Sequence, residues 1–249
     1  MTRHPIRAAG VFAVVLLALT GTLYAAQQAS FAPRGELPQT TSYVVPAVTA
    51  PAPVVVPRRQ GARVPLIDPA WAADTAARAG IPEPALLAYA RATLMAPASC
   101  GIGWTTLAGI GWVESQHGTI GGRRLDGDGY SSALILGPAL NGAGKVAAIP
   151  ATAESTAWHG DPDWDHAVGQ MQFIPSTWEM WSSDGDGDGA ADPNDIDDAA
   201  YAAARYLCAD GRDLSTGEGW SGGVFSYNHA EVYVDAVHAA ASAYAERTA

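Results

Sequence analysis

The sequence WTTLAGIGWVESQHG occupies residues 104–118 and decides the fold class. Its apolar side chains recur at helical spacing, so we predict a helix over residues 104–117 that ends at Gly118. Glu114, near the end of this apolar helix, is its one carboxylate. A carboxyl group at the apolar end of a helix that faces a cleft has its charged form desolvated, which raises its pKa toward the range for proton donation at neutral pH. An exposed helix-terminal glutamate is the plain alternative.

The flanking segments predict further helices. Asp68 as N-cap, Pro69 in the first turn and Gly80 at the end predict a short helix over residues 68–80. Apolar spacing and Ala-rich composition predict three more, over residues 82–97, 196–209 and 230–246.

A capping box formed by Ser176 and Glu179 predicts one more helix after Pro175. Residues 118–168 are rich in Gly, Asp, Pro and Ser and lack periodicity, which is typical of a functional or flexible stretch. No run of sequence shows the alternation that a large sheet requires. We therefore predict a mainly α fold, with a single helical domain over residues 66–249.

The first 65 residues predict an export signal followed by a linker. Basic residues precede an apolar run over residues 8–26, an order that is typical of a signal peptide or an uncleaved signal anchor within residues 1–30. A buried core helix is the plain alternative. Residues 31–65 are rich in Pro, Ala and Val, which indicates an extended, disordered linker. We therefore expect an exported protein, either secreted or anchored to the membrane by residues 8–26.

The only two cysteines are Cys100 and Cys208. In an exported protein such a pair predicts a disulfide, with free buried thiols as the alternative. Closing a loop of this length contributes about 4 kcal/mol to stability in the chain-entropy model.

Acidic residues outnumber Lys and Arg by 25 to 14, which argues against a nucleic-acid-binding protein. The block of residues 161–198 holds 11 of them and no Lys or Arg. Within it, residues 184–195 read DGDGDGAADPND, which fits an EF-hand calcium loop with a glycine at the sharp turn. The predicted ligands are Asp184, Asp186, Asp188, the carbonyl of Ala190, Asp192 and Asp195. We therefore predict a structural Ca²⁺ site; a plain Asp-Gly turn is the alternative.

Two other segments carry groups that suit a sugar ligand. Gln170 and Gln172 lie beside Phe173, and amides next to an aromatic plane match the hydroxyls and the apolar face of a sugar. Tyr227 and Asn228 add a hydroxyl and an amide just before the last predicted helix.

Three motifs, GWVESQHG (111–118), AVGQMQFIPSTW (167–178) and YNH (227–229), resemble in order and spacing the catalytic domain of lytic murein transglycosylases. The resemblance is to the exported B-type group, which has a lysozyme-like fold, and it covers about residues 80–240. Two positions depart from the pattern of that group. Gln170 stands where the group often has Pro, and His166 stands where it often has Arg.

The resemblance implies an enzyme that cleaves the β-1,4 bond from N-acetylmuramic acid to N-acetylglucosamine in peptidoglycan and leaves a 1,6-anhydro end. Glu114 would act as the single acid and base. The candidate substrate-binding residues are Ser115, Arg123, Arg124, Gln170, Gln172, Phe173, Tyr227 and Asn228. The resemblance also implies calcium in the acidic loop. We expect no organic cofactor, and peptidoglycan strands as the partner.

The residues alone leave two other functions open. If Asp163 or Asp165 were a second catalytic carboxylate, the protein would be a muramidase that uses water as nucleophile. A silent module that binds the cell wall is the third interpretation, and the presence of Glu114 argues against it.

Overall fold

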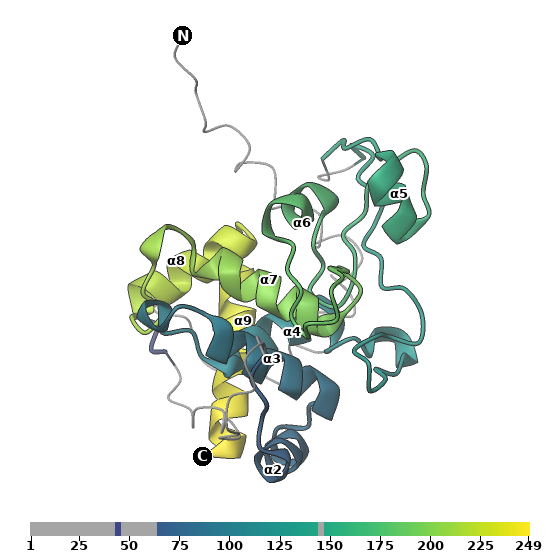
Figure 1. Ribbon diagram of the computed structural model, residues 1–249. Helices are drawn as coiled ribbons and strands as arrows, with labels where there is room; N and C mark the ends of the chain where they lie inside the picture. The colour runs from purple at the N-terminus through teal and green to yellow at the C-terminus, as the bar shows by residue number, and fades with distance from the viewer. Residues whose placement is uncertain (1–42, 46–63, 144–146) are drawn as a thin grey trace.

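The computed structural model describes residues 43–45, 64–143 and 147–249, and Figure 1 shows them as an assembly of helices. Within these ranges, β structure is limited to isolated bridges. The α-helices are α2 (Pro69–Ala79), α3 (Glu83–Met95), α4 (Trp104–Ser115), α5 (Ala153–His159), α6 (Pro175–Trp181), α7 (Ile196–Leu207), α8 (Gly217–Tyr227) and α9 (Glu231–Thr248). Short 3-10 helices lie at η2 (Ala98–Cys100), η3 (Ile120–Gly122) and η4 (Ala209–Gly211). The prediction of a mainly α fold is confirmed, and the architecture is consistent with a lysozyme-like helical domain.

Helix α4 lies at the centre of the core, where it packs against α3, α7 and α9. Because α4 is apolar on all sides, neighbouring helices can cover all of its faces. Leu107 and Ile110 of this helix are fully buried. Gly111 allows α3 to approach closely, because a Cβ at this position would overlap the hydroxyl of Tyr89. This packing carries the C-terminal end of α4, with Glu114, into the interior.

Helix α2 begins and ends where the sequence predicts. The Asp68 carboxylate accepts hydrogen bonds from the backbone N–H groups of Ala70 (2.8 Å) and Trp71 (2.9 Å), and so caps the helix. Gly80 ends it in the left-handed conformation.

Helix α4 ends two residues earlier than predicted. Gln116 and His117 both have positive φ, at 54° and 58°, so the chain leaves the helix after Ser115. The ring of His117 is fixed between two tyrosine hydroxyls, with Nδ1 3.0 Å from Tyr89 and Nε2 2.8 Å from Tyr244. We attribute the early end to these buried hydrogen bonds, which require the ring to turn back into the core.

Two helices were not predicted, and one begins differently. Helix α5 lies in the stretch that was expected to be irregular, and it projects as a separate lobe in Figure 1. Helix α8 contains four glycines in eleven residues, a composition that disfavours helices in isolation, and buried Trp220 anchors it. The predicted capping box before α6 is wrong. Pro175 already occupies the first turn after Ile174, so Ser176 lies inside the helix.

A disulfide joins Cys100 to Cys208, with Cα atoms 5.4 Å apart, so this prediction is confirmed. It connects η2, just after α3, to the residue that follows α7. Two segments separated by 108 residues are thereby held together on one side of the core.

The described part of the predicted linker contacts the helical domain. The Tyr43 hydroxyl donates a 2.7 Å hydrogen bond to Asp235 of α9, and its ring lies against Trp220 and His238. His238 Nε2 in turn lies 2.9 Å from the Val44 carbonyl oxygen. These contacts differ from the expectation of an extended, disordered linker over the whole of residues 31–65.

The apolar run over residues 8–26 lies outside the described residues, as does most of the predicted linker. Among the residues that the structure describes, no helix has the length and hydropathy needed to cross a membrane.

Candidate active site

Glu114 is a buried carboxyl group in the last turn of α4, with 3% of its surface exposed. The hydroxyl of Tyr233 donates a 2.6 Å hydrogen bond to its Oε1. Its Oε2 accepts no hydrogen bond from the described residues. Burial raises the pKa of Glu114 to about 8, and the hydrogen bond from Tyr233 partly opposes this rise. The group is therefore protonated at neutral pH and has one oxygen fixed and one oxygen uncommitted.

Three aromatic rings from different parts of the chain form a row beside this carboxyl group. Tyr233 of α9 stacks almost parallel to Tyr227 of α8, with centroids 6.5 Å apart and an interplanar angle of 6°. Phe173 meets Tyr227 edge-on at 5.9 Å. Burial raises the pKa of Tyr227 well above its ordinary value, and the negative charge that Glu114 acquires at high pH adds to this rise. The row therefore links the residue 173 segment to Glu114.

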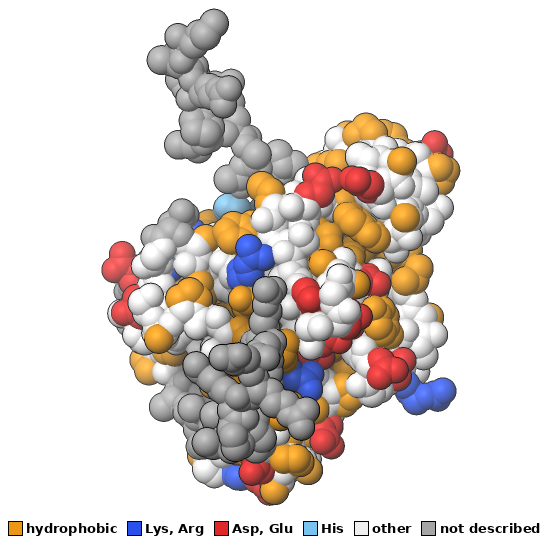
Figure 2. Space-filling view, in the orientation of Figure 1, with side chains coloured by type: hydrophobic (Ala, Val, Ile, Leu, Met, Phe, Trp, Pro, Cys, Tyr) orange, Lys and Arg blue, Asp and Glu red, His pale blue; other side chains and the backbone are white. Residues whose placement is uncertain are grey.

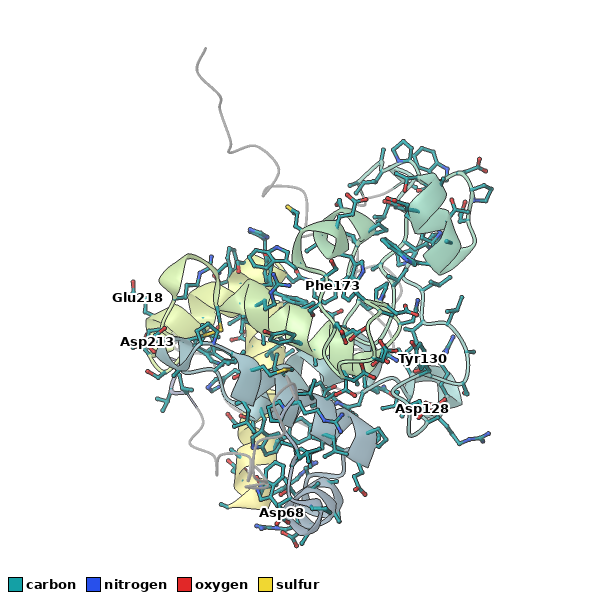
Figure 3. All side chains as sticks on the ribbon, in the orientation of Figure 1. Asp68, Asp128, Tyr130, Phe173, Asp213 and Glu218 are labelled. Atoms are coloured by element: carbon teal, nitrogen blue, oxygen red, sulfur yellow. A yellow bond between two sulfur atoms is a disulfide. The ribbon has the colours of Figure 1, made fainter. Side chains whose placement is uncertain are left out.

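Tyr227 and Phe173 are held by the interior of the protein. The Tyr227 hydroxyl donates a 2.8 Å hydrogen bond to the Met171 carbonyl oxygen. Phe173 is 3% exposed and packs edge-on against Trp178 of α6. Figure 3 shows Phe173 in the middle of the side-chain assembly, close to α6 and α7. The structure thus gives Phe173 a supporting position behind Tyr227 instead of an exposed face for a sugar.

Ser115 and Gln170 bind each other. The Ser115 hydroxyl donates a 2.6 Å hydrogen bond to the Gln170 carbonyl oxygen, and it accepts one from the Gly118 N–H at 2.8 Å. The Gln170 side-chain amide donates to the carbonyl oxygens of Gly129 and Asn194. Both residues are buried, and their polar groups connect protein segments.

Gln172 and Asn228 are better placed to have polar groups available. Gln172 is half-buried, has a positive φ of 50°, and donates through Nε2 to the Gly169 carbonyl at 2.9 Å. Asn228 follows α8 directly, and its buried Oδ1 accepts no hydrogen bond from the described residues. A buried amide oxygen of this kind is a ready acceptor for a ligand hydroxyl.

The two arginines after α4 behave differently from one another. Arg123 donates hydrogen bonds to the carbonyl oxygens of Ile120, Ala133 and Leu134, so it closes the loop that follows α4. Arg124 has an exposed side chain. Of the two arginines that were predicted to bind substrate, Arg124 is therefore the one with an accessible guanidinium group.

Asp165, one of the two candidates for a second catalytic carboxylate, belongs to a buried network around α5. Its Oδ1 accepts a 2.5 Å hydrogen bond from the Ser155 hydroxyl and lies 3.3 Å from Nε2 of His159. Asp163, the other candidate, is exposed. The known partners of Asp165 therefore lie in the α5 lobe and not beside Glu114.

His166, where the resembling group often has Arg, also stabilises this lobe. Its Nδ1 lies 2.7 Å from the Gly137 carbonyl oxygen, and its Nε2 lies 3.1 Å from Oδ2 of Asp161. The hydrogen bond from His166 is the main cause that lowers the pKa of Asp161 to about 2.

A cavity of about 540 Å³ borders the same central helix. Trp112, Gln116 and His117 line it from α4 and the turn beyond, together with residues of α2 and the start of α3. Glu114 is not among the lining residues, so the cleft expected at Glu114 is not this cavity.

The acidic loop, residues 184–195, precedes α7. Figure 2 shows acidic side chains gathered on the face near the N-terminal end of that helix. Asp184, Asp186 and Asp188 each offer one carboxylate oxygen, and these oxygens lie within 4.8 Å of one another. Among the described residues, this is the group of acidic and His or Cys side chains that is close enough to share an ion. Three hard oxygen donors at this spacing fit a calcium ion.

Asp195, the last of the predicted ligands, has another role in the loop. Asp195 caps α7, because its Oδ1 accepts a 2.8 Å hydrogen bond from the Asp197 N–H. Asp198, which the sequence did not indicate, accepts from the N–H groups of Gly185 (2.6 Å) and Asp192 (2.8 Å). Burial, together with neighbouring acidic charges, raises the pKa of Asp195 to about 7 and that of Asp198 to about 6.

Residues 156–224 match the family model of the transglycosylase SLT domain. The match supports a lytic transglycosylase-like domain in this chain. It includes Gln170, Gln172 and Phe173, whereas Glu114 lies before it and Tyr227 just after it. No curated protein and no solved structure matches the chain.

Tyr233 is the member of the site that the sequence did not reveal. It is the third residue of α9, a helix that was predicted from apolar spacing and Ala-rich composition. No local pattern indicates this contact, because it requires α9 to pack against α4.

Proposed function

We propose that this protein is a lytic transglycosylase that cleaves the β-1,4 bond from N-acetylmuramic acid to N-acetylglucosamine in peptidoglycan. One observation carries the proposal: Glu114 is a buried carboxyl group with a pKa raised to about 8, and one of its oxygens is fixed by Tyr233. The match of residues 156–224 to the transglycosylase SLT domain supports the glycan substrate.

Glu114 would first act as a general acid. Its proton passes to the oxygen that leaves with N-acetylglucosamine, while the bond from that oxygen to the anomeric carbon breaks. A carboxyl group that is protonated at neutral pH is suited to this step. Because Oε1 accepts the hydrogen bond from Tyr233, the proton to be transferred resides on Oε2.

Glu114 would then act as the base. Its carboxylate takes the proton from the muramoyl 6-hydroxyl, whose oxygen bonds to the anomeric carbon and closes the 1,6-anhydro ring. No water is consumed, and Glu114 regains its proton at the end of the cycle. One carboxylate is enough, because the substrate acetamido group can stabilise the positive anomeric centre, a recognised exception to the two-carboxylate scheme. The contacts of Asp165 with Ser155 and His159 agree with a single catalytic carboxylate.

The substrate contacts would come from residues outside α4. Asn228 offers its unpaired Oδ1, and Gln172 lies on the hairpin that carries Phe173. The exposed guanidinium of Arg124 is suited to the anionic groups of the stem peptide or glycan. Ser115, Gln170 and Phe173 would act indirectly, by holding the segments that carry Glu114, Gln172 and Tyr227.

Product analysis tests the reaction. The full-length protein is incubated with purified peptidoglycan, and the soluble fragments are analysed by mass spectrometry. Fragments with 1,6-anhydro ends support the proposal. Reducing ends, heavier by one water, would indicate a muramidase, and binding without soluble fragments would indicate a wall-binding module. Glu114→Gln removes the proton donor and should abolish release; a variant with undiminished release would overturn the assignment.

We also propose that the acidic loop binds Ca²⁺ in a structural role. Asp184, Asp186 and Asp188 would contribute carboxylate oxygens, and the Ala190 carbonyl and Asp192 follow at the spacing of an EF-hand loop. Asp195 is engaged as the cap of α7, which favours weaker binding than a loop with a free bidentate ligand at its last position. The ion would offset charges that otherwise repel one another.

For the compartment we propose export, with residues 8–26 as a cleaved signal or as an anchor. The disulfide supports this proposal, because such bonds persist in oxidising compartments. Mass spectrometry of the mature N-terminus, combined with fractionation of cells, tests it. A mature chain that begins after residue 26 indicates secretion, an intact membrane-bound chain indicates anchoring, and an intact protein in the cytoplasm contradicts both.

A further inference from the structure

Gln170 binds three separate segments of the chain at once. Its Nε2 donates to the carbonyl oxygens of Gly129 (2.9 Å) and Asn194 (2.8 Å), and its own carbonyl oxygen accepts from the Ser115 hydroxyl (2.6 Å). Only 1% of the surface of Gln170 is exposed, so water does not compete for these hydrogen bonds. The same residue therefore contacts the end of the acidic loop and the end of α4.

On the loop side, the contact extends to the backbone next to Gln170. Gly169 approaches the Pro193 carbonyl so closely that a Cβ at position 169 would overlap it, and its φ of +75° is one that glycine adopts readily. The N–H of Ile196, at the start of α7, donates a 3.1 Å hydrogen bond to the same Gly129 carbonyl oxygen that Gln170 binds. Displacement of the loop end would therefore disturb the Gln170 bonds.

On the helix side, Ser115 transmits the contact to the catalytic carboxyl group. Ser115 is the neighbour of Glu114 and the last residue of α4. Its hydroxyl binds the Gln170 carbonyl and the Gly118 N–H, so it fixes both the last turn of the helix and the reversal that follows. The direction in which Glu114 projects depends on this turn.

A small cavity lies beside Gln170. It has a volume of about 40 Å³, and Gln170, Asn194 and Tyr130 are among the residues that line it. The side-chain oxygens of Gln170 and Asn194 are buried and accept no hydrogen bond from the described residues. A cavity needs roughly 10–15 Å³ to hold one water molecule, so this volume is sufficient for one. Figure 3 shows Tyr130 on the same side of the molecule as Asp128.

We propose that Gln170 is a positioning residue that couples the order of the acidic loop to the position of Glu114. Anything that orders or loosens residues 184–195, including a bound cation, is then felt at the catalytic carboxyl group through Asn194, Gln170 and Ser115. The consequence for catalysis rests on the proposed function, whereas the coupling itself does not.

Hydrogen exchange measured by mass spectrometry on the full-length protein tests the coupling. Gln170→Met keeps the approximate volume and removes the side-chain donor. Exchange should become about five- to tenfold faster both in residues 115–119 and in residues 184–195, as expected for the loss of one or two hydrogen bonds. The matched control is Arg205→Met, which also removes a side chain that binds two backbone carbonyl oxygens, those of Trp181 and Ser182. It should leave residues 115–119 unchanged.

A second variant perturbs the loop alone. Asp198→Ala removes the carboxylate that accepts from Gly185 and Asp192, and so loosens the loop from within. In the protein with Gln170, exchange in residues 115–119 should accelerate, whereas in the Gln170→Met background Asp198→Ala should add nothing there. The proposal is overturned if residues 115–119 do not respond to Asp198→Ala, or if they respond equally in both backgrounds. Should Gln170→Met fail to fold, Ser115→Ala replaces it, because it removes the hydrogen bond from Ser115 to the Gln170 carbonyl oxygen.

The activity readout separates this proposal from the proposed function. A positioning role predicts that Gln170→Met lowers kcat several-fold with little change in KM and that it moves the basic limb of the pH profile, whose position Glu114 sets. If the protein shows no lytic activity at all, the proposed function fails while the exchange result stands. If activity is present and the exchange pattern is absent, the coupling fails alone.

Discussion

The hydroxyl of Tyr233 lies 2.6 Å from Oε1 of Glu114, and both side chains are buried. This contact joins α4 to α9 at the candidate active site, and it acts on Glu114 in two ways. It fixes the orientation of the carboxyl group, and it favours the charged form, which lowers a pKa that burial has raised.

Tyr233→Phe should therefore have two effects of different kind. The rate should fall about tenfold or more, because the general acid loses its orienting hydrogen bond. The protonated form is the reactive one, so activity declines as the pH rises through the pKa of Glu114, about 8. Removing a hydrogen bond that lowers this pKa moves the decline to higher pH. The measurement is the pH dependence of glycan release from pH 5 to pH 10.

Tyr244→Phe is the matched control for this experiment. Tyr244 lies on the same helix and its hydroxyl also makes a buried hydrogen bond, but to His117 and not to Glu114. For Tyr244→Phe, the decline of glycan release at high pH should occur at the same pH as in the unsubstituted protein. If the decline of glycan release by Tyr233→Phe stays at the same pH or moves to lower pH, the assignment of Glu114 as the acid is contradicted.

Glu114→Gln should increase stability in a pH-dependent manner. The folded-state pKa of about 8 exceeds the ordinary value of 4.5, so the folded state retains a proton that the unfolded state releases. The resulting stabilisation is fully present below the unfolded pKa and is lost as the pH rises through the folded pKa, at up to about 1.4 kcal/mol per pH unit. Glutamine does not titrate, so the Tm advantage of Glu114→Gln should grow between pH 5 and pH 8.

The exposed glutamate of α6 provides the comparison. Glu179→Gln also removes one carboxylate, but from the surface, and its Tm difference should remain flat over the same range. A constant Tm difference for Glu114→Gln would show that this carboxyl group is ionised in the folded protein at pH 7 and would exclude it as a general acid.

Removal of the calcium site should reduce the stabilisation that added Ca²⁺ gives to the folded protein. If Ca²⁺ binds the folded loop alone, its addition at about 100 times Kd raises the unfolding free energy by about 2.7 kcal/mol. Asp186→Asn removes one of the three clustered carboxylates and should weaken the rise in Tm on titration with CaCl₂. Asp128→Asn, in the shorter Asp-Gly turn at residues 126–129, is the control and should respond as the unsubstituted protein does. An equal Tm with CaCl₂ and with EDTA for the unsubstituted protein would contradict the site.

The helices that could be predicted from sequence are those with strong local signals. Asp68, Pro69 and Gly80 define α2 through chemistry confined to that segment, and the pairing of Cys100 with Cys208 followed from the count of cysteines. Helix α8 has no such signal. Its glycines disfavour a helix, and it forms because Trp220 is buried against the rest of the domain, which is a tertiary effect.

For the candidate site, the sequence indicated the proposed acid but not the residue that binds it. Glu114 was indicated by its apolar helix together with the resemblance of three motifs to lytic murein transglycosylases, whereas Tyr233 contacts it from 119 residues away. Gln170 was identified as a sugar-binding amide, because an amide beside an aromatic ring suits a sugar. Its bonds to Gly129 and Asn194 depend on how three distant segments meet, which periodicity and motif spacing do not encode.

The contact of Tyr43 with α9 predicts that the segment before the helical domain stabilises it. Tyr43 donates a hydrogen bond to Asp235 and places its ring against Trp220 and His238. Tyr43→Phe removes the hydrogen bond and should reduce the unfolding free energy of the full-length chain by about 1 kcal/mol. Tyr43→Ala also removes the ring contacts and should cost more, by about a further 1 kcal/mol. Urea unfolding followed by tryptophan fluorescence measures both, since Trp220 lies in the contact.

The two substitutions together separate docking from a solvated spacer. If residues 43–45 do not dock in solution, Tyr43→Phe and Tyr43→Ala will both unfold at the same urea concentration as the unsubstituted chain. Asp235→Asn supplies the reciprocal test, because it weakens the acceptor of the same hydrogen bond. In a double-mutant cycle, Tyr43→Phe should have little further effect in the Asp235→Asn background, and fully additive losses would show that the two side chains do not interact.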